Sequence, residues 1–371
     1  MMTPRERLIR ALRGEAPDSR PFIGPGGMMN MAITEVMQQT GSLWPDAHCN
    51  SRAMSRLALG VQRLTGADNL GVPFCMTVEA EAMGAEVTMG TVDSEPRVAG
   101  YPLSVVAEWP RLREIETGSG RVAVVAEAVN LLAEEAIEAG DLPVVANLTG
   151  PVSLATSLVE PMIMFRAMGK EPRAVHDLLA FITDNLISFG RVLLQAGAQV
   201  LTVADPSASG EILGPRRFAE FALPYLNRIM DELNSDCQYG LVHICGQLHP
   251  IFAEIGDLHT GAMSVDSVTS IAGFRNGVPG KAVVGNVSTH LLLNGQPDQV
   301  RAAALHCLRQ GAAVLAPACG ISPRTPLANL QAMARAAQDF AGTGHEPRTA
   351  SEPAKITSLY GKWPIDPERL T

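Results

Sequence analysis

The sequence predicts an α/β protein of the (β/α)8 barrel class, and three observations support this fold. Short, almost continuously apolar segments alternate with segments of helical periodicity. Strands buried on both faces lose the polar alternation of half-exposed strands, so these runs indicate a parallel sheet covered by helices. The alternation continues without a break to residue 340. The competing prediction is an open doubly wound sheet, but no G-x-G-x-x-G motif follows the first strand.

The first predicted element is a short amphipathic helix in an N-terminal extension, residues 1–20. Thr3 is placed to cap this helix, Pro4 occupies its first position, and Glu6 completes a capping-box pattern. Gly14 follows the last apolar residue of the helix and ends it.

Strands and helices alternate along the rest of the chain. Apolar runs bounded by turn-forming residues predict strands, and apolar residues spaced three and four apart predict helices. The predicted strands are residues 21–24, 86–89, 97–98, 142–147, 200–204, 240–243, 262–265, 281–286 and 313–315. The predicted helices are residues 47–64, 120–138, 172–195, 215–233, 250–255, 297–310 and 326–340. We treat residues 1–371 as a single barrel domain, with residues 342–371 as a C-terminal strap on its surface.

The composition excludes several classes of function. The formal net charge is −9, and no basic run is long enough to follow a phosphate backbone, so we expect no nucleic-acid partner. No stretch approaches the roughly 18 uninterrupted apolar residues of a membrane-spanning helix. No signal-peptide core is present, and the six cysteines are too sparse for a disulfide scaffold. These features predict a cytoplasmic location.

The strongest candidate site is the pair His243 and Cys245 at the end of a predicted strand. Alternate residues of a strand face the same side, so an imidazole and a thiolate can reach one ion. Cys319 lies at another strand-to-loop junction, whose loop can face His243 across a closed barrel. One imidazole and two thiolates suit zinc, and three protein ligands are typical of a catalytic site. The alternative is ordinary core packing, while Pro250 assigns the nearby His249 to a helix cap.

Further polar residues at predicted strand ends are candidates for binding a cofactor or a substrate. Asn147, Asp205 and Asn286 each end a buried strand. Asn and Asp at strand ends also commonly satisfy the amides of a turn, which is their alternative role. Glu79 and Glu81 are candidate proton relays or pocket walls, and their alternative is a solvated or capping acid.

Several motifs resemble the methylcobamide:coenzyme M methyltransferases of the uroporphyrinogen decarboxylase superfamily, over about residues 3–340. The motifs are T-P-R-E-R at residues 3–7, the segment 72–84, H-I-C-G at residues 243–246 and A-C-G at residues 318–320. The resemblance implies a (β/α)8 barrel and a zinc ion held by His243, Cys245 and Cys319. In related enzymes an acidic residue about one β/α step later takes the fourth zinc position until a thiol arrives, and Asp266 matches it.

The resemblance implies a zinc-dependent methyltransferase that acts between a methylated corrinoid protein and a small thiol such as coenzyme M. The loop at residues 24–31 would then contribute to the surface that accepts the corrinoid. Met28 and Met29 would supply apolar contacts in this loop, and core filling is their alternative role. The alternative role of Asp266 is a loop-capping acid or an acceptor behind the zinc ligands.

Three other functions, and other acceptors such as tetrahydrofolate, stay open at this point. The first is a substrate:corrinoid methyltransferase of the same fold, which would transfer a methyl group from a methylated substrate to the corrinoid protein. A decarboxylase of the porphyrinogen type is disfavoured, because residues 22–28 read FIGPGGM where that family has an arginine-rich R-Q-A-G-R element. A non-enzymatic subunit stabilised by a closed, four-ligand zinc site is the third.

Overall fold

A parallel β-sheet forms the centre of the computed structural model, which describes residues 2–233, 237 and 239–341. The strand order is β1-β4-β5-β6-β7-β8, and each neighbouring pair is parallel. The strands are β1 (Leu70–Val72), β4 (Val144–Thr149), β5 (Val200–Ala204), β6 (Tyr239–Ile244), β7 (Ala262–Val265) and β8 (Ala282–Val284).

Two extended segments close this sheet into a barrel. Val314 bridges to Val284 of β8, and the next residue, Leu315, bridges to Phe22; both bridges are parallel. Phe22 is joined in turn to the start of β1, because the Asp68 carboxylate accepts its backbone N–H at 2.8 Å. The Asp68 N–H donates to the Phe22 carbonyl at 2.7 Å. The six strands and these two segments confirm the predicted (β/α)8 barrel.

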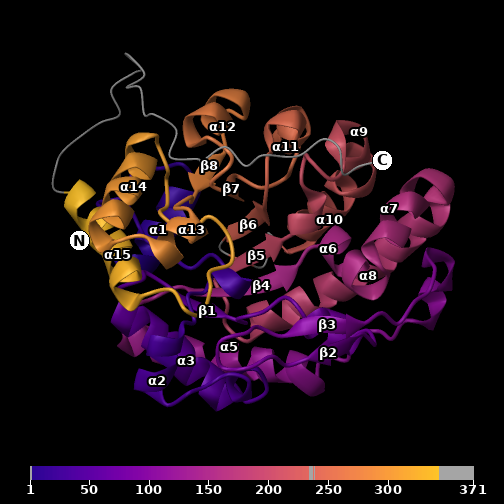
Figure 1. Ribbon diagram of the computed structural model, residues 1–371, viewed down its shortest axis with the longest axis horizontal. Coiled ribbons are helices and arrows are strands. Elements are labelled where there is room, and N and C mark those ends of the chain that lie inside the picture. Colours follow the sequence, from indigo (N-terminus) through magenta and orange to yellow (C-terminus); the bar gives the residue numbers. More distant parts are fainter. Residues whose placement is uncertain (1, 234–236, 238, 342–371) are drawn as a thin grey trace, which may run out of the picture.

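Helices surround the barrel (Figure 1). Several of them begin with proline, whose fixed φ and missing N–H suit the first turn of a helix. The helices are α2 (Thr34–Thr40), α3 (Ser51–Thr65), α4 (Val78–Ala82), α5 (Gly120–Glu138), α6 (Pro151–Leu158), α7 (Pro161–Lys170), α8 (Pro172–Gln195), α9 (Gly214–Phe221), α10 (Leu223–Leu233), α11 (Phe252–Gly256), α12 (Ile271–Gly277), α13 (Thr289–Asn294), α14 (Pro297–Arg309) and α15 (Leu327–Ala341). Short 3-10 helices are η1 (Gly27–Met29), η2 (Asp46–His48), η3 (Val106–Arg111), η4 (Pro206–Ala208) and η5 (His249–Ile251).

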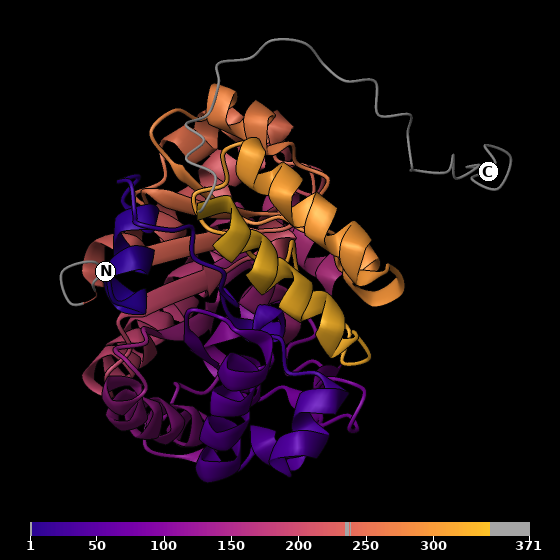
Figure 2. The same cartoon turned by 90° about the vertical axis from the view of Figure 1, so that its left-hand side faces the viewer.

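Helix α1 (Pro4–Leu12) closes the amino end of the barrel and has the expected capping box. The Glu6 N–H donates to Thr3 Oγ1 at 3.2 Å, and the Thr3 N–H donates to the Glu6 carboxylate at 3.1 Å. The buried face of α1 belongs to a cluster with inward-facing residues of the barrel wall, which are Ile23, Val145, Val200, Leu241, Ala262, Ala282, Val284, Val314 and Ala316. Figure 2 shows α1 in indigo, apart from α14 and α15. Because this end is filled with apolar side chains, a polar site is left to the opposite, carboxyl end.

Several elements differ from the sequence-based expectations. Strand β1 was missed because it has only three residues and ends against Pro73, a pattern typical of a turn. Helices α2, α4, α6, α7, α12 and α13 were also missed, and the predicted helix 215–233 is two helices, α9 and α10. The predicted strands near residues 86 and 97 are β2 (Glu86–Thr88) and β3 (Arg97–Gly100), which form a separate antiparallel hairpin.

The remaining expectations about the chain's organisation concern its ends and the membrane. The predicted strap at residues 342–371 lies outside the described residues, so it and the single-domain assignment stay predictions. Among the helices that the structure describes, none has both the length and the apolar character needed to cross a bilayer.

Candidate metal centre and its surroundings

His243, Cys245 and Cys319 come together at the carboxyl end of the barrel. One potential ligand atom from each of the three lies within 4.8 Å of the other two. Cys245 Sγ lies 3.0 Å from His243 Nε2 and 2.8 Å from Cys319 Sγ. His243 and Cys245 share one face because they are alternate residues at the end of β6. Cys319 reaches them because its segment is bridged to the residues that follow β8, through Val287 and Pro317.

Ser264 fixes the orientation of the His243 ring from the neighbouring strand. The two residues are register partners in β6 and β7, and His243 Nδ1 lies 2.9 Å from Ser264 Oγ. If Nδ1 carries the proton and donates it to this hydroxyl, Nε2 keeps a free lone pair toward Cys245. The sequence analysis missed Ser264. Its position two residues before Asp266, on the same face of a strand, was the available signal.

Replacing Ser264 with alanine is expected to weaken metal binding without unfolding the barrel. Loss of a partner behind a metal-ligating histidine typically lowers metal affinity by about 10- to 100-fold. The measurement is the zinc dissociation constant by competition with a chromophoric chelator. The matched control is Ser188→Ala, because Ser188 is exposed on α8 and, among the described residues, its hydroxyl donates to the Asp184 carbonyl alone. Equal zinc affinity in the Ser264 and Ser188 variants would contradict the role given to Ser264.

The two thiols of the cluster influence each other's ionisation. The hydrogen bond between them lowers the pKa of Cys319 and raises the pKa of Cys245, because the protonated Cys245 thiol can donate to the Cys319 thiolate. Burial opposes the formation of a second negative charge. A cation that neutralises both sulfurs therefore fits this cluster well.

Asp266 lies beside the cluster and contacts it through the turn after Cys245. Its Oδ2 accepts the Gly246 N–H at 3.2 Å, while its Oδ1 accepts the Ser267 hydroxyl at 3.1 Å and the Val268 N–H at 3.2 Å. Its negative charge contributes to the raised pKa of Cys245. In this arrangement Asp266 holds the turn that carries Cys245.

Asn286 and His249 lie near the metal ligands but are not among the three converging residues. The Asn286 side-chain N–H groups donate to the carbonyls of Asp266 and Thr269, both at 2.8 Å, so Asn286 steadies the Asp266 loop. His249 begins the 3-10 helix η5, in keeping with its assignment to a helix cap, and the group of three ligand atoms does not include it.

Asp205 is fully buried at the end of β5 and contacts the start of helix α6. Its carboxylate accepts the Val152 N–H at 3.1 Å, the Ser153 N–H at 2.7 Å and the Ser153 hydroxyl at 2.6 Å. Burial raises the pKa of Asp205 to about 6, and the bonds from Ser153 and Val152 only partly offset this rise. These contacts tie α6 to β5, and a role in binding a cofactor stays a prediction.

Asn147 lies inside the barrel on β4. The loop that follows the Phe22 segment, residues 24–31, packs against it. A Cβ atom added at Gly26 would lie 2.6 Å from Asn147 Oδ1, so only glycine fits there. Two residues further on, Met28 packs against Gly320, where a Cβ would lie 2.9 Å from Met28 Cβ. The Met28 carbonyl also accepts the Ile321 N–H at 3.2 Å. This loop therefore connects Asn147 with the backbone next to Cys319.

Met28 and Met29 differ in exposure. Met28 is half-buried and packs against Gly320, the residue after Cys319, whereas Met29 is buried. A role for either methionine in binding a corrinoid stays a prediction, and only Met28 retains partial exposure for it.

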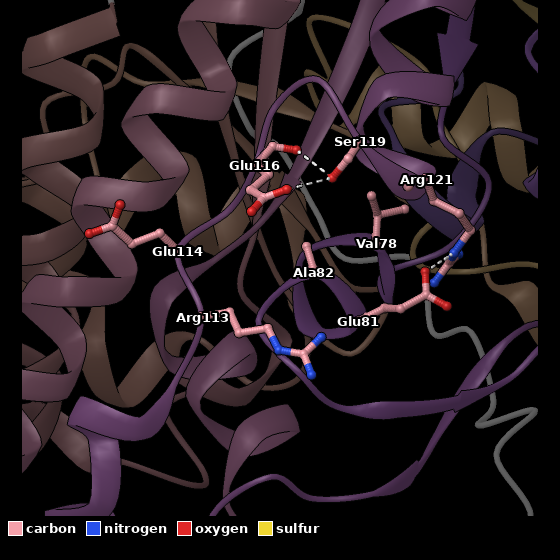
Figure 3. A pocket seen from close by; sticks show the side chains of 9 residues that line it. Val78, Glu81, Ala82, Arg113, Glu114, Glu116, Ser119 and Arg121 are labelled. Carbon is pink, nitrogen blue, oxygen red and sulfur yellow. Dashed lines mark hydrogen bonds and ion pairs between the residues drawn. The ribbon is translucent and has the colours of Figure 1, made fainter.

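Glu79 and Glu81 belong to a second polar region around helix α4, apart from the metal ligands. Glu79 is buried and accepts the Thr149 N–H and hydroxyl at 2.8 and 2.9 Å, and burial raises its pKa. Glu81 forms an ion pair of 2.5 Å with Arg121, a buried arginine that sequence reasoning missed. Figure 3 shows this pair at one side of a cavity of about 400 Å³, whose lining also includes Arg113.

Comparisons with known proteins agree along most of the chain. The family model of uroporphyrinogen decarboxylase (URO-D) matches residues 3–340. The chain is 31% identical over 341 residues to methylcobamide:CoM methyltransferase MtaA of Methanosarcina barkeri, covering 91% of this chain and 98% of MtaA. It is 30% identical to a methylated-thiol–coenzyme M methyltransferase of Methanosarcina mazei, covering 91% and 90% of the two chains. A solved methyltransferase structure from Methanosarcina mazei superimposes with a TM-score of 0.83 at 32% identity, covering 92% and 99%. The chain therefore belongs to the uroporphyrinogen decarboxylase (URO-D) family.

Proposed function

We propose that this protein is a methyltransferase that moves a methyl group from a corrinoid carried by a partner protein to the sulfur of a small thiol, with zinc at His243, Cys245 and Cys319. The observation that supports it is the convergence of one imidazole nitrogen and two thiol sulfurs within 4.8 Å. The curated relatives include enzymes named for methylcobamide and coenzyme M and one named for a methylated thiol. A cytoplasmic location stays a prediction from composition.

The donor set fits zinc by its chemistry. Nitrogen and sulfur donors suit this ion, and three protein ligands leave a fourth position for a substrate atom. The Ser264 contact at His243 Nδ1 is the kind of support that metal-ligating histidines usually have. When bound, zinc supplies a Lewis acid that lowers the pKa of an acceptor thiol so that it reacts as a thiolate.

The chain's own residues hold the proposed metal ligands in position. In the methyl transfer, the methyl–cobalt bond of the donor breaks and its electron pair stays on the corrinoid. An S–CH₃ bond replaces the S–H bond of the acceptor, and the thiol proton must leave the site. Ser264 keeps the His243 ring fixed, and Asp266 keeps the Cys245 turn fixed. Asp266 is also half-buried beside the cluster, so we assign it the removal of this proton or the temporary occupation of the acceptor's position.

Replacing Asp266 with asparagine tests this assignment. The variant is expected to keep about one zinc per chain, because Asp266 is not among the three converging ligands. Its transfer rate is expected to fall by about 10²-fold, the lower end of what a positioned acid or base contributes. Asp298→Asn is the control, because Asp298 is exposed in the first turn of α14. Loss of zinc would show that Asp266 is instead an essential ligand, and an unchanged rate would remove it from the mechanism.

The proposed function is tested with the purified full chain in one sample. Zinc is quantified first, and loss of the methyl–cobalt absorption of methylcobalamin is then followed with and without coenzyme M. About one zinc per chain and thiol-dependent loss of this absorption are the expected results. Zinc without any response to thiols would favour a substrate:corrinoid methyltransferase, and absence of zinc would overturn the proposed metal centre.

A further inference from the structure

We propose that Asn147 and Thr202, inside the barrel, bind the polar tail of the acceptor thiol through uncharged hydrogen bonds. This inference rests on the proposed function, because it takes the acceptor's sulfur to lie at His243, Cys245 and Cys319. It adds a basis for acceptor specificity to the proposed function. The protein selects thiols whose tail forms hydrogen bonds, and that tail need not be charged.

Both side chains face the barrel interior. Val145 of β4 and Val200 of β5 pack in the cluster that helix α1 closes, so they point inward. Asn147 and Thr202 each follow two residues later and share that face, because side chains alternate along a strand. Leu241 and His243 are related in the same way on β6. Asn147, Thr202 and His243 therefore all face the barrel interior, from three successive strands.

Both side chains are buried with unpaired polar atoms. Asn147 is 1% exposed and Thr202 is 0% exposed. Neither the Oδ1 nor the Nδ2 atom of Asn147, nor the hydroxyl of Thr202, has a hydrogen-bond partner among the described residues. Leaving a buried polar group unpaired costs about 1–3 kcal/mol, so native proteins rarely keep several together without a partner from solvent or ligand. Asn147 and Thr202 are also register partners in β4 and β5, which places the unpaired groups side by side.

The pair lies close to the metal cluster and on its inner side. In the β5–β6 register His243 is opposite Ala204, two residues nearer the carboxyl end than Thr202. On the other side, Gly26 packs on Asn147 and Met28 packs on Gly320, next to Cys319. Two residues of extended chain span at most about 7 Å, so a short ligand can join the two places.

The residues of the barrel wall favour a neutral mode of recognition. None of the six strands of the described sheet contains a lysine or an arginine. Asn147 supplies an amide and Thr202 supplies a hydroxyl, and each group can both donate and accept hydrogen bonds. An alcohol tail and a sulfonate tail can each use these groups, whereas an alkyl tail leaves them unpaired.

The test is a calorimetric titration of the zinc-loaded full chain with 2-mercaptoethanesulfonate, 2-mercaptoethanol and ethanethiol. The wild-type protein is expected to bind the first two about tenfold more tightly than ethanethiol, the effect of one or two neutral hydrogen bonds. Asn147→Ala and Thr202→Val are expected to remove most of this preference and to leave the ethanethiol affinity and the zinc content unchanged. Thr202→Val keeps the side-chain shape, so it serves if the Asn147 variant does not fold.

Thr183→Val is the matched control. Thr183 is also fully buried with an unpaired hydroxyl, but it lies on α8 outside the barrel strands, so its replacement should alter no thiol affinity. Equal wild-type affinity for all three thiols, or an equal loss for all three in the Asn147 and Thr202 variants, would overturn the inference and leave the methyltransferase proposal intact. Such results would indicate that Asn147 and Thr202 bind an internal water molecule instead of the acceptor. If the wild-type chain bound none of the thiols, the proposed function itself would fall.

Discussion

Cys319→Ala protein is expected to lose its zinc and with it the thiol-dependent methyl transfer. The substitution removes one of the three converging ligand atoms and leaves only His243 and Cys245, which are too few to hold zinc tightly. Because ionisation of the acceptor depends on the metal, the transfer rate is expected to fall by at least about 10³-fold, as when an essential catalytic group is removed. Zinc content by mass spectrometry and loss of the methylcobalamin absorption measure the two effects.

The fold of the Cys319 variant should survive. The cluster lies at the carboxyl end of a large barrel whose core is formed by apolar side chains, so the metal contributes little to folding compared with one in a small zinc domain. Circular dichroism and the melting temperature check this. The control is Cys49→Ala, because Cys49 is exposed and outside the metal cluster. Full zinc content in the Cys319 variant would refute the three-ligand assignment.

The stability difference between the wild type and Asp205→Asn is expected to depend strongly on pH. Burial raises the folded-state pKa of Asp205 from 3.8 to about 6. The folded protein therefore binds this proton more tightly than the unfolded chain does. The resulting stabilisation is fully present below pH 3.8 and is lost as the pH rises through about 6. A shift of about two units corresponds to about 3 kcal/mol.

Urea denaturation at a series of pH values measures this difference. The asparagine at position 205 has no such proton, so the stability of the wild type relative to the variant should fall by about 3 kcal/mol between about pH 4 and pH 7. Effects of pH that are common to both proteins cancel in the comparison. Asp298→Asn, on the surface of α14, should show no such trend. A difference that stays constant or increases with pH would contradict the assigned burial effect.

The sequence predicted the barrel because its elements carry local signals. The strands β4, β5 and β6 are mostly apolar and almost entirely buried, as expected of strands covered on both faces, and the helices α5 and α8 have the predicted bounds. Strand β1 lacked such a signal. Its three residues are stabilised by pairing with β4, a contact that no local pattern reveals.

The candidate metal ligands were identified from sequence because two of them are alternate residues of one strand, and that geometry is local. The sequence by itself determined the α/β barrel class, the helix that closes its amino end and the residue types able to hold zinc. Tertiary structure decided which partners surround them: Ser264 on the His243 ring, Asp205 at the start of α6, and Asn147 beside Thr202 inside the barrel. These contacts join residues on different strands and helices, so closure of the barrel creates them.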